Sequence, residues 1–215
     1  MNDINPSPAD CLDRLKSTDS KLWERTPAHE DFLSVRMGIG SIPASLQPKY
    51  QKAGLLLEPD PLQEEPEKLG KAFEMVSDLP VCLEILKSEL CGIAGSEKEV
   101  RELLKVLALQ IVTNHCYQDV KLVLLLKEDE LAEWEWIKYL PHVWDDDFRI
   151  RFMMCGSAIA HNTLGILFEQ LKERENRVSK SDQGAYSFSQ YVFIVSDAEL
   201  LEEEAISKYL FSGHR

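Results

Sequence analysis

The stretch DVKLVLLLK, Asp119 to Lys127, decides the fold of this chain. Apart from Lys121, the residues between its two ends are all valine or leucine. A run without polar alternation is typical of a strand covered on both faces, as strands are in parallel sheets. We therefore expect a sheet that is flanked by helices.

The segments around this run alternate between helix and strand patterns. Upstream, residues 100–113 carry a wide apolar stripe, which predicts a well-buried helix. Downstream, Asp129 can cap a helix that stops before Pro141. The other predicted elements are strands in VCLEIL (81–86), ELCGIAG (89–95), RIRFMMC (149–155) and QYVFIVSD (190–197), and helices over 158–177 and in AELLEEEAISKYLF (198–211).

This alternation predicts an α/β domain with a P-loop-NTPase-like, mostly parallel sheet of at least four strands after residue 80. Before it, DFLSVRMGIGSIP (31–43) alternates as a half-buried strand, and Ser7 with Pro8 can start a short helix. LLLEPDPLQEEPEKLG (55–70) carries three prolines and indicates a surface connection. We predict an N-terminal stalk or linker lobe of residues 1–65 with short strands, and an ATPase-like domain of residues 66–215. We also expect the chain to be a fragment of a longer protein.

The composition limits the class of partner. The 215 residues are 44% hydrophobic, which is enough for one core with a smaller lobe beside it. The net charge is -13, from 37 acidic and 24 basic residues. Nucleic-acid binding depends on clustered lysine and arginine, and the sequence has no such cluster. We therefore expect no nucleic-acid partner, and a DNA-translocating function is opposed by the charge.

The sequence offers little for metal binding or for hydrolytic chemistry. Its five cysteines are scattered and form no C-x-x-C pair, so we expect reduced core thiols and no metal site. It has no nucleophile elbow and no Ser-His-Asp order, so we assign no catalytic residue. It has neither an apolar opening segment nor a run of the ~18 residues that span a bilayer. We expect this segment of the protein to be soluble.

The glycine turn CGIAGSEKEV, residues 91–100, has the layout of a phosphate-binding loop. In register with G-x-x-x-x-G-K-[ST], the first glycine is Gly92 and the lysine is Lys98. Glu97 replaces the second glycine and Glu99 replaces the magnesium-binding hydroxyl. A carboxylate ~4 Å from a phosphate opposes binding by about 4 kcal/mol at an effective dielectric of ~20. Nucleotide binding here would need an atypical loop.

The same residues have a purely structural interpretation. The string SEKE matches a capping box in which Ser96 caps the helix and Glu99 reaches back. Gly92 and Gly95 then serve only the turn, and the acidic first turn suits the helix dipole.

The apolar run YVFIVSDAE (191–199) resembles a Walker B strand that ends in Asp197, although Asp197 is also a good helix N-cap. Together, Gly92, Gly95, Lys98 and Asp197 are the candidate positions of a vestigial nucleotide site. We expect no cofactor to be held there; in the alternative, they would hold ATP with Mg²⁺.

Several strings together resemble one known family. These strings are LWER (22–25), DFLSVRMGIG (31–40), NHCYQDVKLVLLL (114–126), WEWIKYLPHV (134–143), EQLKEREN (169–176) and YVFIVSDAELL (191–201). They resemble the EssC/EccC/YukBA group of type VII secretion ATPases, which are FtsK/SpoIIIE-like proteins. His115 and Asp119 match an H-S-P-D-like turn of that family, whereas residues 116–118 depart from it.

The resemblance implies a function that composition does not show. Members are membrane-anchored motors that assemble as hexamers and export small helical WXG-type effectors. The matched region is the cytoplasmic stalk with the membrane-proximal, degenerate ATPase-like domain. The implied role is structural or regulatory, on the cytoplasmic face of the bacterial membrane and without insertion by this segment. The implied partners are other domains and subunits of the motor and membrane proteins of the secretion complex.

Overall fold

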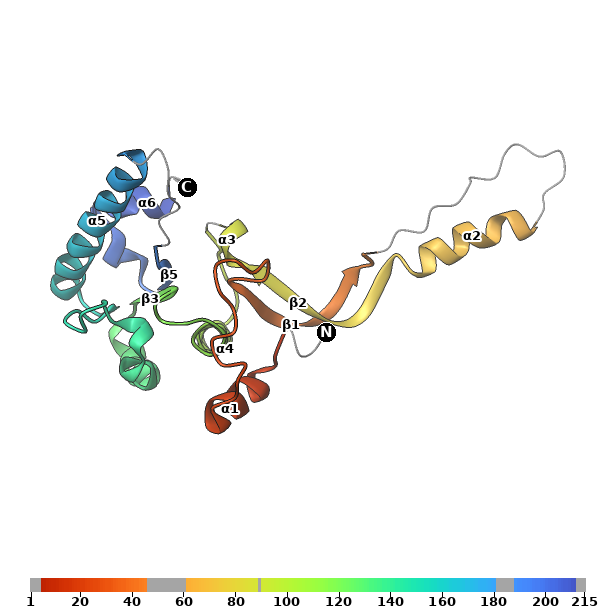
Figure 1. Cartoon of the computed structure of the whole chain (residues 1–215), viewed down its shortest axis with the longest axis horizontal. Helices are drawn as coiled ribbons and strands as arrows, with labels where there is room; N and C mark the ends of the chain where they lie inside the picture. Colours follow the sequence, from red (N-terminus) through yellow and green to blue (C-terminus); the bar gives the residue numbers. More distant parts are fainter. Residues whose placement is uncertain (1–4, 46–60, 89, 181–187, 212–215) are drawn as a thin grey trace.

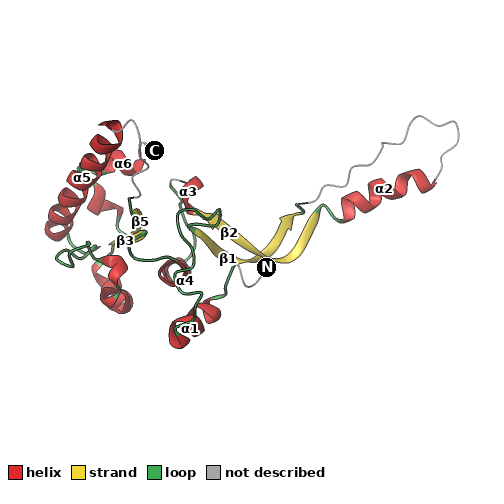
Figure 2. Cartoon of the chain, viewed as in Figure 1, coloured by secondary structure: helices red, strands yellow, loops and turns green. Residues whose placement is uncertain are grey.

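The computed structural model describes residues 5–45, 61–88, 90–180 and 188–211. Its centre is a parallel three-stranded sheet in the order β4-β3-β5. Figures 1 and 2 label β3 and β5 of this sheet. The strands are β3 (Val120–Leu125), β4 (Met153–Met154) and β5 (Gln190–Val195). The predicted α/β class, a mostly parallel sheet flanked by helices, is confirmed.

Strand β3 is the strand predicted from the apolar run. All six of its residues are buried. It pairs with β5 over six consecutive residue pairs and with β4 over two. Its side chains alternate between the two faces of the sheet. Leu122 and Leu124 enter one apolar cluster, and Val123 and Leu125 enter the other.

Helices cover both faces of this sheet. One cluster joins the sheet to α4 (Glu97–Asn114) and to the 3-10 helix η1 (Glu128–Tyr139). The other joins it to α5 (Ser157–Lys180), the 3-10 helix η3 (Ala198–Leu201) and the loop before α6 (Ser207–Phe211). The buried helix predicted over 100–113 is therefore α4, with its start three residues earlier.

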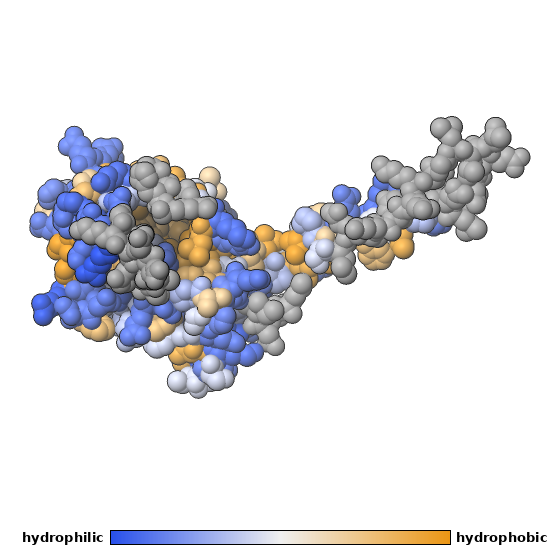
Figure 3. Space-filling view, turned by 45° about the horizontal axis from the view of Figure 1, so that its top comes forward, coloured by the Kyte–Doolittle hydropathy of each residue, from blue (hydrophilic) through white to orange (hydrophobic). Residues whose placement is uncertain are grey.

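A second, antiparallel sheet forms an arm that projects from this body (Figure 1). It pairs β1 (Ser34–Pro43) with β2 (Met75–Glu84), and α2 (Pro61–Ala72) lies at its far end. The strand predicted over 31–43 is confirmed. Strand β2 pairs with β1 across the predicted boundary after residue 65, and the division into two lobes stays a prediction. Figure 3 shows apolar surface along the arm, where Ile39 and Phe73 are 64% and 62% exposed.

The N-terminal segment packs against the body through α1 (Pro8–Ser17). Ser7 caps this helix by accepting a hydrogen bond from the amide of Asp10, as predicted. Cys11 is fully buried. Arg14 donates to the amide oxygen of Asn114 at 3.3 Å, which ties α1 to the end of α4.

Four expectations about individual elements are wrong. Residues 90–95 form a loop and not a strand, and the predicted strand over 149–155 is reduced to β4. The parallel sheet therefore has three strands, because β2 pairs with the arm. The helix expected after Asp129 is the 3-10 helix η1, with Lys127 at its N-cap. The last predicted helix is interrupted between η3 and α6, where Glu203 adopts a φ of 61° within a run of glutamates that repel one another.

The short connection between β2 and the glycine turn is the helix α3 (Ile85–Ser88). A further 3-10 helix, η2 (Pro141–Val143), follows η1. Among the described residues, no helix combines the length and the hydrophobicity needed to cross a membrane.

Candidate functional site at the carboxyl edge of the parallel sheet

The carboxyl ends of β3, β4 and β5 meet at one edge of the sheet. In open α/β sheets, ligands bind in the crevice outside this edge. Asp197 lies two residues after the end of β5. Gly92 and Gly95 lie in the loop before α4, and Lys98 lies in the first turn of that helix. The predicted nucleotide site would therefore lie at this edge of the sheet.

The glycine turn ends in a side-chain cap on the first turn of α4. The Ser96 hydroxyl accepts a hydrogen bond from the amide of Glu99 at 3.4 Å and contacts its carboxylate at 2.6 Å. Ser96 is thus the N-cap of α4, as the structural interpretation expected. Lys98 is exposed, and so are Gly92 and Gly95.

Neither glycine is required by its surroundings. A β-carbon placed on Gly92 would meet no atom within 4 Å. One on Gly95 would lie 3.4 Å from a methyl group of Val100, which is an ordinary contact. Among the described glycines, only Gly156 has a positive φ. The packing and backbone conformation of the turn itself therefore do not require glycine at either position.

Asp197 also has a structural role. Its carboxylate accepts a hydrogen bond from the amide of Glu199 at 3.2 Å and caps the 3-10 helix η3. Its own amide lies 3.4 Å from the carbonyl oxygen of Leu125 at the end of β3. The roles proposed for Lys98 and Asp197 toward a nucleotide stay predictions.

An ion-pair network fills the space between α4 and the sheet edge. Arg101, one turn after Lys98, places its Nε 3.4 Å from Glu130 and one terminal nitrogen 2.5 Å from Glu133. Its other terminal nitrogen is 3.3 Å from Glu97. Arg101 therefore neutralises carboxylates of both α4 and η1.

Glu130 connects this network to the strand ends. Only 4% of Glu130 is exposed. The Ser196 hydroxyl, directly after β5, donates to its carboxylate. The amide of Lys127 donates to Ser196 Oγ at 3.3 Å and to the Glu130 carboxylate at 3.4 Å. The ends of β3 and β5, η1 and α4 are thus joined through one buried carboxylate.

The electrostatics support a persistent network. Hydrogen bonds from Lys105 and Arg101 hold the pKa of Glu133 below its usual value. The hydrogen bond to Glu133 raises the pKa of Arg101. Both partners are therefore charged at neutral pH.

Two further carboxylates act on Cys155, which follows β4. Burial raises the pKa of the Cys155 thiol after β4, and the carboxylates of Glu128 and Asp197 add to that rise. A phosphate placed close to either carboxylate would be repelled. In the described part of the chain, no group of three or more His, Cys, Asp or Glu side chains could hold a metal ion.

Two buried histidines lie away from this edge. His115 Nε2 accepts a hydrogen bond from the amide of Leu33 at 3.0 Å, and His142 Nε2 lies 2.9 Å from the carbonyl oxygen of His115. Burial lowers the pKa of each histidine to about 4. Both are neutral at pH 7 and join the N-terminal segment to the sheet, which is a structural role.

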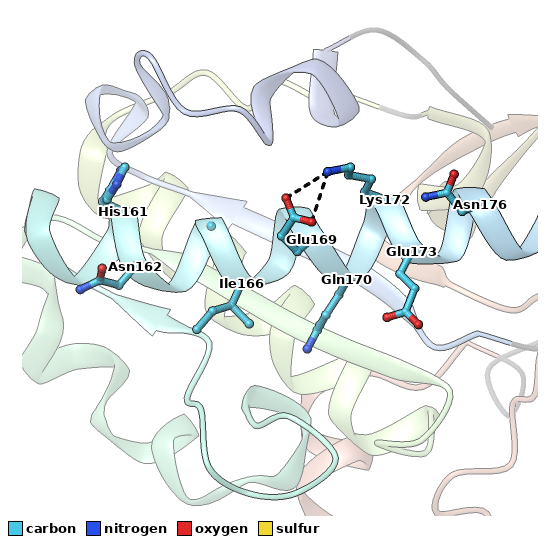
Figure 4. Close-up of a pocket in the computed structure, with 9 residues that line it drawn as sticks. His161, Asn162, Ile166, Glu169, Gln170, Lys172, Glu173 and Asn176 are labelled. Carbon is cyan, nitrogen blue, oxygen red and sulfur yellow. Dashed lines mark hydrogen bonds and ion pairs between the residues drawn. The ribbon is translucent and has the colours of Figure 1, made fainter.

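A shallow hollow of about 730 Å³ runs along α5. All nine residues that line it come from that one helix (Figure 4). Figure 4 shows them in two rows, with His161, Glu169, Lys172 and Asn176 on one side and Asn162, Ile166, Gln170 and Glu173 on the other. These side chains do not converge on a common point, so the hollow is not a ligand site.

The Arg101–Glu130–Ser196 network was not predicted from the sequence. Its members are separated by 29 and 66 positions, and neither helical nor strand periodicity links them. The only local signal is Glu97, four residues before Arg101 on the same helix face.

No family model matches the chain. Several known proteins, however, are similar to it in sequence. It is 31% identical over 197 residues to the ESX secretion system protein EccC of Geobacillus thermodenitrificans. It is 25% identical over 213 residues to the type VII secretion system protein EssC of Staphylococcus aureus, and 24% identical over 196 residues to the ESX secretion system protein YukB of Bacillus subtilis.

These matches cover 91%, 98% and 90% of this chain but only 13%, 14% and 13% of the respective relatives. The chain therefore spans about one seventh of the length of each relative. The resemblance inferred from the sequence is confirmed: the homologues are type VII secretion system proteins.

Proposed function

We propose that this chain, homologous to a segment of the type VII secretion proteins EccC, EssC and YukB, is a non-catalytic, ATPase-like module of such a protein. It would couple the membrane part of a secretion motor to downstream ATPase domains. In that setting it would act at the cytoplasmic face of the membrane, within a hexamer that supports export of WXG-type effectors. Its contacts would be other motor subunits and membrane proteins of the secretion complex.

One observation carries the non-catalytic part of this proposal. The crevice edge of the parallel sheet is occupied by the chain's own charges: Arg101 meets Glu130, and Glu130 meets Ser196. Breaking a buried ion pair leaves an uncompensated charge, which is strongly unfavourable. A nucleotide would have to displace this pair and also approach Glu128 and Asp197. This arrangement supports a structural role for the domain more than it supports a nucleotide-binding pocket.

The alternative is a domain that binds or hydrolyses ATP through an atypical loop. Lys98 supports this alternative, because it stands in P-loop register, is exposed and could reach a phosphate. A neighbouring subunit could supply the missing groups.

Calorimetric titration with ATP and Mg²⁺ separates the two functions. We expect no binding heat at millimolar nucleotide for the wild-type chain, and the same for Lys98→Ala. Micromolar binding that Lys98→Ala abolishes would contradict the scaffold proposal and establish the alternative. Lys87→Ala is a matched control, because Lys87 is an exposed lysine on α3 outside the predicted loop.

A further inference from the structure

An aromatic pair is exposed on the 3-10 helix η1. Trp136 is 38% exposed and Tyr139 is 76% exposed. Side chains three residues apart eclipse along a 3-10 helix, so the two rings form one ridge with Glu133. Trp134 and Ile137, by contrast, form a buried ridge of the same helix. Neither exposed ring belongs to the two apolar clusters of the body.

The ring of Trp136 is held in place by the protein itself. It lies 6.4 Å from the ring of the buried Trp134, with an angle of 19° between the two planes. Stacking on a fixed side chain restricts the rotamers of Trp136, so a contact with this ring costs less conformational entropy. Tryptophan and tyrosine are also among the residues that dominate binding energy in protein interfaces. The exposed ridge therefore has the properties of a contact site.

A lysine of the chain shows which chemical group this ridge attracts. The Lys138 ammonium lies 5.0 Å from the centre of the Tyr139 ring and also pairs with the Glu135 carboxylate. It therefore meets two attractive groups at once, the face of a ring and a carboxylate beside it. Because Tyr139 is 76% exposed, Lys138 leaves most of this ring accessible.

The charge of η1 favours a basic partner. Together with its N-cap residue Lys127, η1 carries five acidic and two basic residues. Three of the acids pair with arginine or lysine side chains of the chain. Glu128 and Asp129 are exposed and have no ion pair within the part of the chain that the structure describes. A nucleobase could also stack on the rings, but these carboxylates would repel its phosphates.

We propose that the ridge of Glu133, Trp136 and Tyr139 is a docking site for an arginine-bearing segment of another protein. A planar guanidinium can stack on either ring and at the same time donate hydrogen bonds to the carboxylates beside it. The lysine ammonium is more strongly hydrated and has no planar face, so it fits the ridge less well. The partner's arginine would compete with Lys138 for the face of Tyr139.

Nuclear magnetic resonance titration of the 215-residue chain tests the proposal. The probes are tetra-arginine and tetra-lysine peptides of equal charge, at about 150 mM salt to screen distant charges. We expect tetra-arginine to shift the indole N–H resonance of Trp136 and to bind about threefold to tenfold more tightly than tetra-lysine. Trp136→Ala and Tyr139→Ser should each reduce this preference to less than about twofold, with the backbone amides of η1 as the readout.

Removal of the competing lysine provides a second test. Lys138→Ala should tighten the binding of tetra-arginine about twofold to fivefold, because it frees one face of Tyr139. Lys172→Ala is the matched control, since Lys172 pairs with Glu169 three residues earlier and lies 5.8 Å from the centre of the Phe168 ring on α5. This control changes the net charge equally but on another surface, and it should leave the affinity within about twofold of wild type.

Three results would overturn the proposal. The first is equal affinity for the two peptides, which would show attraction by charge without stacking on the rings. The second is a preference for arginine that survives both ring variants. The third is a shift of the Trp136 resonance by a neutral proline-rich peptide or a single-stranded oligonucleotide and not by tetra-arginine. None of these results depends on ATP, so this proposal and the scaffold role can fail separately.

Discussion

The body and the arm of this molecule contain sheets that are stabilised in opposite ways. In the body, β3 is buried on both faces and its neighbours extend the same two cores. In the arm, β1 and β2 have only each other, and Ile39 and Met75 are 64% and 49% exposed. Two strands alone are marginal in water. The comparison indicates that the body folds through side-chain burial, whereas the arm depends on its attachment to the body.

The largest expected effect is in the centre of the body. Leu124→Ala removes a fully buried side chain from β3. It should lower the free energy of unfolding by about 2–5 kcal/mol, through lost burial and the cavity that remains. Chemical denaturation followed by circular dichroism measures this change, and a loss below that range would show that the sheet tolerates a cavity at its centre.

The second effect is a loss of folding stability at acidic pH. The pKa values of His115 and His142 are about 4 in the folded chain, below the ordinary value of 6.5. The unfolded chain therefore binds more protons between these pH values, and the two histidines should cost stability as pH falls from ~6.5 to ~4.

The loss should be on the order of 2–3 kcal/mol for His115, and it should level off below pH ~4 for this group. Denaturation at pH 7 and at pH 4.5 measures it, with a His115→Gln variant as comparison. If wild type and variant show the same pH dependence between these values, His115 is not the group responsible.

A smaller effect is expected at the carboxyl edge. Glu130→Ala removes the carboxylate that accepts from the Ser196 hydroxyl and the Lys127 amide and that pairs with Arg101. We expect a loss of about 1–3 kcal/mol, the usual contribution of hydrogen bonds to a charged group. Glu102→Ala is the control, because Glu102 is an exposed acid on α4 that pairs with Lys105. Equal stability of the two variants would contradict the role of Glu130 as the connecting residue.

The smallest effect is expected in the arm. Ile39→Ser replaces a side chain that is 64% exposed and should change the free energy of unfolding by less than about 0.5 kcal/mol. A loss comparable to that of Leu124→Ala would show that Ile39 is buried in solution and would invalidate the contrast between arm and body.

The sequence predicted those parts of the molecule that depend on local patterns. The apolar run of β3, the stripe of α4 and the caps at Ser7 and Ser96 are each encoded within a few neighbouring residues. The strand expected in residues 89–95 was wrong, because an apolar string with two glycines can also form a loop. Strand pairing depends on distant segments, so the sequence did not reveal that β2 joins the arm.

The candidate site was predictable only in part. The register of Lys98 and the two opposing glutamates followed from the motif itself. The residues that occupy the edge could not be predicted from the motif. Arg101, Glu130 and Ser196 meet only after three separate elements pack. Within its own sequence neighbourhood, each of these residues resembles an ordinary exposed polar residue.

We propose that the chain's own network closes the carboxyl edge and that no nucleotide binds there. Hydrogen exchange at the amides of Lys127 and Ser196, with and without millimolar ATP and Mg²⁺, tests this proposal at the residues concerned. We predict the same exchange rates in both conditions, because the network already satisfies these groups. Slowing by tenfold or more on addition of nucleotide, confined to this edge and to the glycine turn, would contradict the account.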